Sequence, residues 1–138
     1  MTGIVLDASA VIAMLESEPD SPALREALVA AGPRWIGAVG VMECAIVLER
    51  RRGSLAKAGL DALLARFDIR ILAFDDAQVA TAHRAYQQFG KGRHPAALNL
   101  GDCCAYAASR SLGLPLLQKG NDFRETDLEL VRWWEAAG

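Results

Sequence analysis

Four acidic residues occupy positions at which a carboxylate could take part in catalysis. Asp7 directly follows the apolar run 4–6, and Asp102 stands at the expected start of a helix. Asp122 follows a later apolar run, and Glu43 lies inside an apolar helical stretch. Each aspartate could instead be a helix cap or a turn residue. Glu43 is harder to explain, because glutamate is rarely buried without a partner and no Lys or Arg lies one helical turn away.

A shared site for these acids would need a cation or a shared proton. Two unit charges ~4 Å apart repel each other by roughly 4 kcal/mol at an effective dielectric constant of 20. A set of oxygen ligands without His or Cys favours hard ions such as Mg²⁺ or Mn²⁺. Such ions activate water and shield the charge that develops on a phosphate. The residues alone therefore predict metal-dependent hydrolysis of a phosphoester.

Apolar runs and helical patterns alternate along the chain and predict the elements that carry the acids. This alternation is typical of a parallel sheet with helices on both faces. Ligands of such sheets bind outside the carboxyl ends of the strands, where Asp7 and Asp122 would lie. We expect an α/β fold with three layers (α/β/α) and a central parallel sheet of about five strands, as a single domain over residues 1–138. The expected strands are 4–6, 34–37, 68–74, 114–117 and 128–131.

Helix boundaries are predicted from capping residues and breaks. Ser9 and Ser21 are expected to be the N-caps of the first two helices. A third helix is expected over residues 39–52, and because its first part is apolar nearly all round, we expect it to be mostly buried. Further helices are expected after Ser54, after Asp76 and over residues 103–112.

The composition limits the partners that the whole chain could attract. The 15 Lys and Arg against 17 Asp and Glu give a net charge of −2, so binding to a nucleic acid would need a local basic patch. No apolar run reaches the ~20 residues that span a bilayer, and the first residues lack the pattern of a signal peptide. We therefore expect a cytoplasmic protein without membrane contact. The candidate basic residues are Arg50, Arg51, Arg52, Lys91 and Arg93, for which a solvated surface is an equally good explanation.

Several short motifs occur in a fixed order along the chain. They are Leu-Asp-Ala-Ser-Ala at 6–10, Glu43 near the start of an apolar helix, Leu-Gly-Asp-Cys at 100–103, and Leu-Leu-Gln-Lys-Gly-Asn-Asp-Phe at 116–123. Together they resemble the PIN domain, and in particular the VapC ribonuclease toxins of bacterial toxin–antitoxin pairs. The most specific part is Gly-Asn-Asp-Phe followed by Thr-Asp at 126–127, and the resemblance covers essentially the whole chain.

The resemblance implies a role for each of the four acids. In that family the matching residues coordinate Mg²⁺ or Mn²⁺ and activate water to cleave RNA, and those matching Asp7 and Asp102 are the firmest ligands. The resemblance also implies that Ser9 lines the site. It places Asp127 near the metal ligands without contact to the ion.

One departure from the family pattern concerns the residues just before the helical glutamate. Many relatives carry Ser or Thr hydroxyls there, whereas this chain has Gly37 and Gly40. The change removes possible hydrogen bonds to Glu43 or to the attacking water, and it leaves the ligand set intact.

The resemblance also implies partners. Such toxins are held inactive by a cognate VapB-like antitoxin, whose C-terminal segment occupies the active-site groove. They are usually homodimers, and their substrate is an RNA, often a particular transfer RNA.

Two other functions are considered beside the ribonuclease. A phosphatase of the haloacid-dehalogenase type also begins with an Asp after its first strand, but it needs a second Asp where this chain has Ser9, and a Lys for which Lys119 is the only candidate. A non-catalytic receiver-like binding domain would put the acids to regulatory use. Its phosphoacceptor follows a third strand, where Asp75 and Asp76 look like a helix start.

Overall fold

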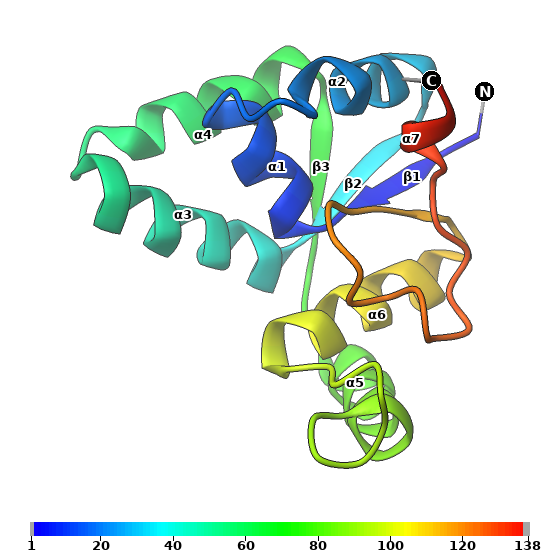
Figure 1. The fold of residues 1–138 in the computed structure, drawn as a ribbon. Coiled ribbons are helices and arrows are strands. Elements are labelled where there is room, and N and C mark those ends of the chain that lie inside the picture. The colour runs from blue at the N-terminus through cyan, green and yellow to red at the C-terminus, as the bar shows by residue number, and fades with distance from the viewer. Residues whose placement is uncertain (1, 137–138) are drawn as a thin grey trace.

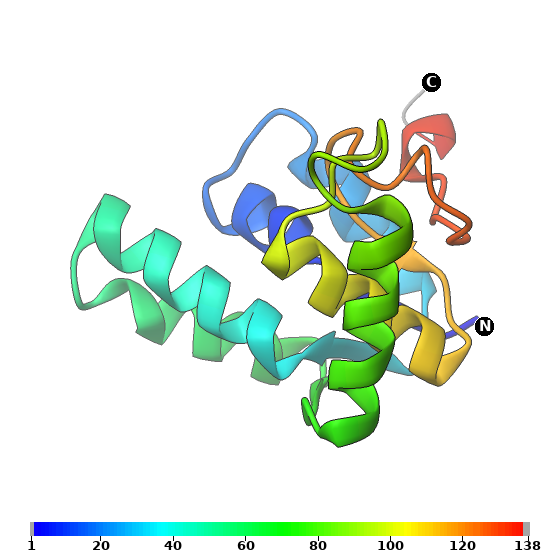
Figure 2. The ribbon, with the colours of Figure 1, turned by 90° about the horizontal axis from the view of Figure 1, so that it is seen from below.

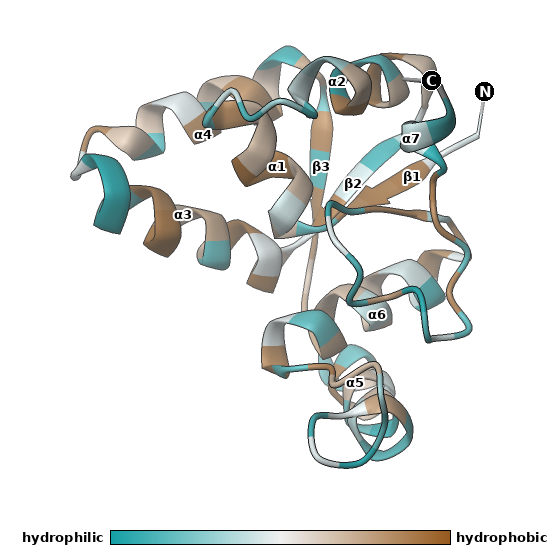
Figure 3. Cartoon of the chain, viewed as in Figure 1, coloured by the Kyte–Doolittle hydropathy of each residue, from teal (hydrophilic) through white to brown (hydrophobic). Residues whose placement is uncertain are grey.

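A four-stranded parallel sheet forms the centre of the molecule (Figure 1). The computed structural model describes residues 2–136. The strands are β1 (Ile4–Leu6), β2 (Arg34–Gly37), β3 (Ile69–Leu72) and β4 (Leu116–Leu117), in the order β3-β2-β1-β4. β1 lies in the interior of the sheet, and all three of its residues are buried and apolar (Figure 3). The prediction of an α/β fold with a parallel sheet is confirmed.

Helices cover both faces of the sheet and give the expected three layers. Residues of β1 alternate between two cores: Ile4 and Leu6 pack with the helices of one face, and Val5 packs with those of the other. Figure 2 shows the second face, with α5 and α6 in front of the sheet. The helices on the first face are α1 (Ala8–Leu15), α2 (Ser21–Ala30), α3 (Ala38–Arg52) and α4 (Ala56–Arg66). The helices on the second face are α5 (Asp76–Phe89) and α6 (Leu100–Leu112). The last helix is the short α7 (Trp133–Ala136).

The predicted fifth strand over residues 128–131 is wrong. This segment makes one isolated bridge to β4, in which Leu116 donates to the carbonyl of Glu129 and Val131 donates to the carbonyl of Leu116. The next position of such a ladder would need the carbonyl of Gln118, but that oxygen accepts a hydrogen bond from the indole Nε1 of Trp133 at 2.7 Å. Because Trp133 also begins α7, the pairing stops after one bridge.

The expectation that the third helix is mostly buried is also wrong. Only Cys44 and Leu48 of α3 are buried, while Met42 and Ile46 are 59% and 44% exposed. The cause is visible in Figure 1, where α3 and α4 run outward together beyond the sheet, so that one side of α3 has no neighbour. Within residues 2–136, no helix combines the length and the apolar character that crossing a membrane requires.

Candidate active site

The candidate site lies at the carboxyl edge of the sheet, where the first turns of α1, α3 and α6 meet (Figure 1). Asp7 comes directly after β1, and Asp122 lies in the segment that follows β4. Glu43 is in the second turn of α3, and Asp102 is in the first turn of α6. Three helix starts and two strand ends therefore carry residues that are 20 to 115 positions apart in the sequence to one edge of the sheet.

Asp7 is both a helix cap and a member of the site. It is the N-cap of α1, which corrects the prediction that Ser9 has this role. Its Oδ2 atom accepts hydrogen bonds from the Ser9 N–H at 3.0 Å and from the Ser9 Oγ at 2.6 Å. Only 8% of Asp7 is exposed, and this burial raises its pKa above the ordinary value, against the lowering effect of the Ser9 bonds. The capping role fixes the carboxylate at the edge of the sheet.

Ser9 connects Asp7 to the segment after β4. Its Oγ donates to Asp7 and accepts a hydrogen bond from the backbone N–H of Lys119 at 3.0 Å. The Lys119 side chain turns away and forms ion pairs with Glu18 and with Asp20. It is thus engaged elsewhere, which does not favour the phosphatase interpretation.

Asp102 is held by a reciprocal capping box at the start of α6. Its N–H donates to Asn99 Oδ1 at 2.8 Å, and its Oδ2 accepts from the Asn99 N–H at 3.1 Å. Burial raises the pKa of Asp102 to about 6, with further raising by the charges of Asp122 and Asp7. Asn99 was not predicted from the sequence, although an Asn followed three residues later by an acid is the pattern of such a box.

Glu43 completes the cluster from α3. It is half-buried, and burial raises its pKa to about 7, with further raising by the charges of Asp7 and Asp102. Asp122 is exposed, and its charge raises the pKa of both Asp7 and Asp102. Each of the four acids therefore lies within electrostatic range of at least two of the others. The structure brings together all four residues that the sequence singled out.

The four acids form a set of oxygen donors suited to a hard divalent cation. The charges of neighbouring acids help to raise the pKa of Asp7, Glu43 and Asp102, which is the situation that a cation relieves. Among residues 2–136, no three or more Asp, Glu, His or Cys side chains are gathered closely enough to form a ready-made metal site. Mg²⁺ is commonly held by one or two carboxylates and keeps several waters, so an open arrangement of this kind fits it.

Comparison with known proteins identifies the family. A family model, the PIN domain, matches residues 4–129. Ribonuclease VapC of Mycolicibacterium smegmatis is 41% identical over 128 residues, which cover 93% of this chain and 99% of that protein. This chain belongs to the VapC family of PIN-domain proteins. The resemblance found in the sequence motifs is confirmed.

Solved VapC structures share the fold. Mycobacterium tuberculosis VapC20, a Sarcin-Ricin loop cleaving toxin, superposes with a TM-score of 0.76 at 15% identity, covering 93% of this chain and 98% of that one. VapBC2 from Rickettsia felis, bound to a DNA fragment from its promoter, gives a TM-score of 0.74 at 15% identity, with 94% and 97% covered. The predicted architecture is thus that of solved VapC structures.

Asp127 does not join the acid cluster of this VapC-family chain. Its two carboxylate oxygens accept hydrogen bonds from the Tyr106 hydroxyl at 2.7 Å and from Arg110 Nη2 at 2.8 Å. Its charge is not among those that raise the pKa of Asp7 or Asp102. These contacts tie the segment before α7 to α6.

The two glycines that depart from the VapC pattern lie at the start of α3. Gly37 is the N-cap of this helix and provides no side-chain hydrogen bond to it. A Cβ added to Gly40 would lie 3.3 Å from the Ile36 side chain. The start of α3 therefore offers no side-chain hydroxyl at these two positions.

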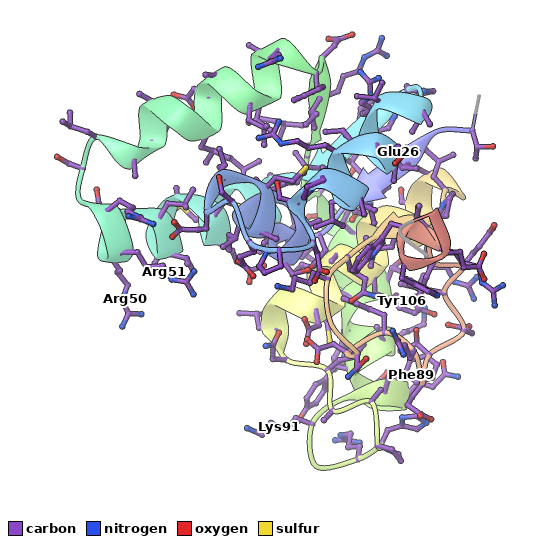
Figure 4. The ribbon with its side chains drawn as sticks, turned by 45° about the horizontal axis from the view of Figure 1, so that its top comes forward. Glu26, Arg50, Arg51, Phe89, Lys91 and Tyr106 are labelled. Atoms are coloured by element: carbon purple, nitrogen blue, oxygen red, sulfur yellow. The ribbon has the colours of Figure 1, made fainter. Side chains whose placement is uncertain are left out.

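The candidate basic residues differ in what they contact. Arg52 donates to Glu16 at 2.6 Å, and Arg51 lies 3.7 Å from the same carboxylate, whose pKa these arginines lower. Arg93 lies over the ring of Tyr86, 5.2 Å from its centroid. Figure 4 shows Arg50 pointing outward from the end of α3, and Lys91 pointing outward from the loop after α5.

Proposed function

We propose that this chain is the toxin of a toxin–antitoxin pair and acts as a Mg²⁺- or Mn²⁺-dependent endoribonuclease. The observation that carries the proposal is the convergence of Asp7, Glu43, Asp102 and Asp122 at one edge of the sheet in a chain of the VapC family. The ion pairs of Lys119 and the capping role of Asp75 favour this function over a phosphatase or a receiver-like domain.

The four acids would have different roles, depending on how rigidly each side chain is held. A bound divalent cation would supply activation of water and shielding of the phosphate. Asp7, fixed by Ser9, and Asp102, fixed by Asn99, are the rigid carboxylates that would hold it. Glu43, which is half-buried and reaches the cluster from α3, would accept the proton of the attacking water at a carboxylate oxygen. Asp122, which is exposed, would face the RNA side of the site.

The proposed substrate is a structured RNA, such as a transfer RNA. Arg50 and Lys91 are exposed and form no ion pair within residues 2–136, so they could bind its phosphates, whereas Arg51 and Arg52 have Glu16 as a partner. To identify the RNA, we would induce the chain in cells and sequence the 5′ ends of all RNAs. Cleavage at one RNA class is expected, with none after induction of Asp102→Asn. Unchanged growth and unchanged 5′ ends with the wild type would contradict the proposal.

The proposed protein partners are a VapB-like antitoxin, as in the solved VapBC complex, and a second copy of the chain. Support for the homodimer is a hollow of about 460 Å³ between α5 and α6, lined by apolar side chains. Its rim includes Val79, Tyr86 and Leu100, which are 51%, 40% and 80% exposed. Analytical ultracentrifugation of the purified chain, in the buffer used for the RNA assay, is expected to give the mass of a dimer. A monomer at every concentration would contradict this part.

A further inference from the structure

The carboxylate of Glu43 lies directly against the backbone of Gly101 in the first turn of α6. A Cβ built on Gly101 would lie 2.5 Å from Glu43 Oε1 and 2.6 Å from Glu43 Cδ, and its nearest atom would be Glu43 Oε2. Cβ atoms in proteins essentially never approach other atoms within 3.0 Å. The carboxylate therefore occupies space that any other residue at position 101 would fill.

Helix formation gives no reason for a glycine at this position. Gly101 does not adopt a positive φ, so its backbone conformation is open to every residue. Glycine is the least favourable helix residue apart from proline, whereas alanine is the most favourable. The three atoms nearest to the added Cβ all belong to Glu43. The one requirement for a glycine at this place is room for that carboxylate.

We propose that Gly101 is a positioning residue for the ribonuclease site: its missing side chain lets the Glu43 carboxylate lie against the first turn of α6, beside Asp102. This inference rests on the proposed function, since it concerns the same acid cluster. The contact between the Glu43 carboxylate and the Gly101 backbone connects α3 to α6. The Glu43 carboxylate is the far end of a flexible side chain. A methyl group at position 101 would therefore displace this carboxylate without disrupting the fold.

The first test compares Gly101→Ala with a matched control, Gly59→Ala. Gly59 lies inside α4, and a Cβ there would have no atom within 4 Å. The control is expected to raise Tm by about 3 °C through helix propensity and to cleave RNA at the wild-type rate. Gly101→Ala is expected to keep the wild-type Tm or exceed it, while kcat falls by about 100-fold, because the acid is moved by an ångström or more. A wild-type kcat for Gly101→Ala would overturn the inference.

A second test needs no activity and separates the inference from the proposed function. Glu43→Ala removes the carboxylate, so adding Gly101→Ala to it should raise Tm by about 2 °C more than the same change does in the wild type. Equal Tm changes in the two backgrounds would overturn the inference. If neither the wild type nor Gly59→Ala cleaves RNA with Mg²⁺, the proposed function fails, and the Tm comparison still decides whether Gly101 positions Glu43.

Discussion

Two side chains of the acid cluster have pKa values near neutrality. Burial is the larger cause for both Glu43 and Asp102, and the charges of neighbouring acids add to it. Near pH 7 the metal-free site therefore holds protons that a divalent cation would have to release. Binding of the proposed cation would accordingly be linked to pH, and its removal would leave like charges close to one another.

This arrangement gives a pH dependence of stability with a definite sign. The pKa of Glu43 is about 7 in the folded chain against an ordinary 4.5, so the folded state binds more protons over that interval, and the free energy of unfolding falls as pH rises through it. In metal-free protein, Tm of Glu43→Gln minus Tm of the wild type is expected to grow from about pH 5 to about pH 8. Thermal denaturation at several pH values measures it, with the exposed Glu49→Gln on the same helix as control. A difference that stays constant with pH would contradict the assignment.

Ser9 connects Asp7 to the segment after β4, in addition to the site-lining role that the family resemblance implies. Its Oγ donates to Asp7 and accepts from the Lys119 N–H, so Ser9→Ala removes a bond from each. We expect RNA cleavage to fall by about 10-fold and the free energy of unfolding to fall by about 1 kcal/mol. Urea denaturation and a cleavage assay provide the two numbers, with the exposed Ser54→Ala as control. Cleavage equal to that of the control would show that the hydroxyl does not orient Asp7.

At the scale of elements, the site is built from helix starts. The sequence offered two explanations for Asp7 and for Asp102, helix cap or site residue. In the structure Asp7 is the N-cap of α1, whereas the N-cap of α6 is Asn99, and Asp102 is the third helical residue that bonds back to it. The sequence could not decide between these explanations, because helix capping is a local pattern, whereas the convergence of Asp7 and Asp102 depends on the path of the sheet. Asn99 was missed for a related reason: the helix was expected to begin at residue 103, three residues later than it does.

Two cap variants can show whether the capping box of α6 affects metal binding in addition to helix stability. Asn99→Ala removes the acceptor for the Asp102 N–H, and it should lower the free energy of unfolding by about 1 kcal/mol. Asp75→Ala removes the matching cap of α5, where Asp75 Oδ1 accepts from the Gln78 N–H at 3.0 Å, and it should cost about the same. Only Asn99→Ala is expected to weaken Mn²⁺ binding, by about 10-fold in a calorimetric titration, because it loosens Asp102, a proposed ligand of the ion. Equal Mn²⁺ affinities for the two variants would contradict this account.

At the scale of the whole molecule, the layers, the parallel sheet and most strand positions were predictable, because hydrophobic periodicity reports them directly. The absence of a fifth strand was not, since it depends on a bond between the Trp133 indole and the Gln118 carbonyl, 15 residues apart. The exposure of Met42 and Ile46 could not be predicted from the sequence either, because it results from the projection of α3 and α4 beyond the sheet.

Because the net charge is −2, the proposed binding of RNA would depend on local basic residues. Arg50→Ala and Lys91→Ala are expected to raise KM for RNA several-fold and to reduce its dependence on salt, with little change in kcat. Lys57→Ala is the control, because this lysine forms an ion pair with Asp61 on α4. Steady-state cleavage at two salt concentrations measures the effect. A KM unchanged in both variants would exclude these two residues from the RNA path.

The central claim is that the acid cluster acts through a divalent cation, and Asp7→Asn tests it most directly. Asparagine is as good an N-cap as aspartate, so this change keeps the start of α1 and removes only the charge. Asp75→Asn makes the same change at the cap of α5 and serves as the control. The measurement is RNA cleavage by purified protein with Mg²⁺ and with EDTA. The account predicts cleavage by the wild type and by Asp75→Asn with Mg²⁺ only, and at least about 100-fold less by Asp7→Asn. Wild-type cleavage by Asp7→Asn, or cleavage that persists in EDTA, would contradict it.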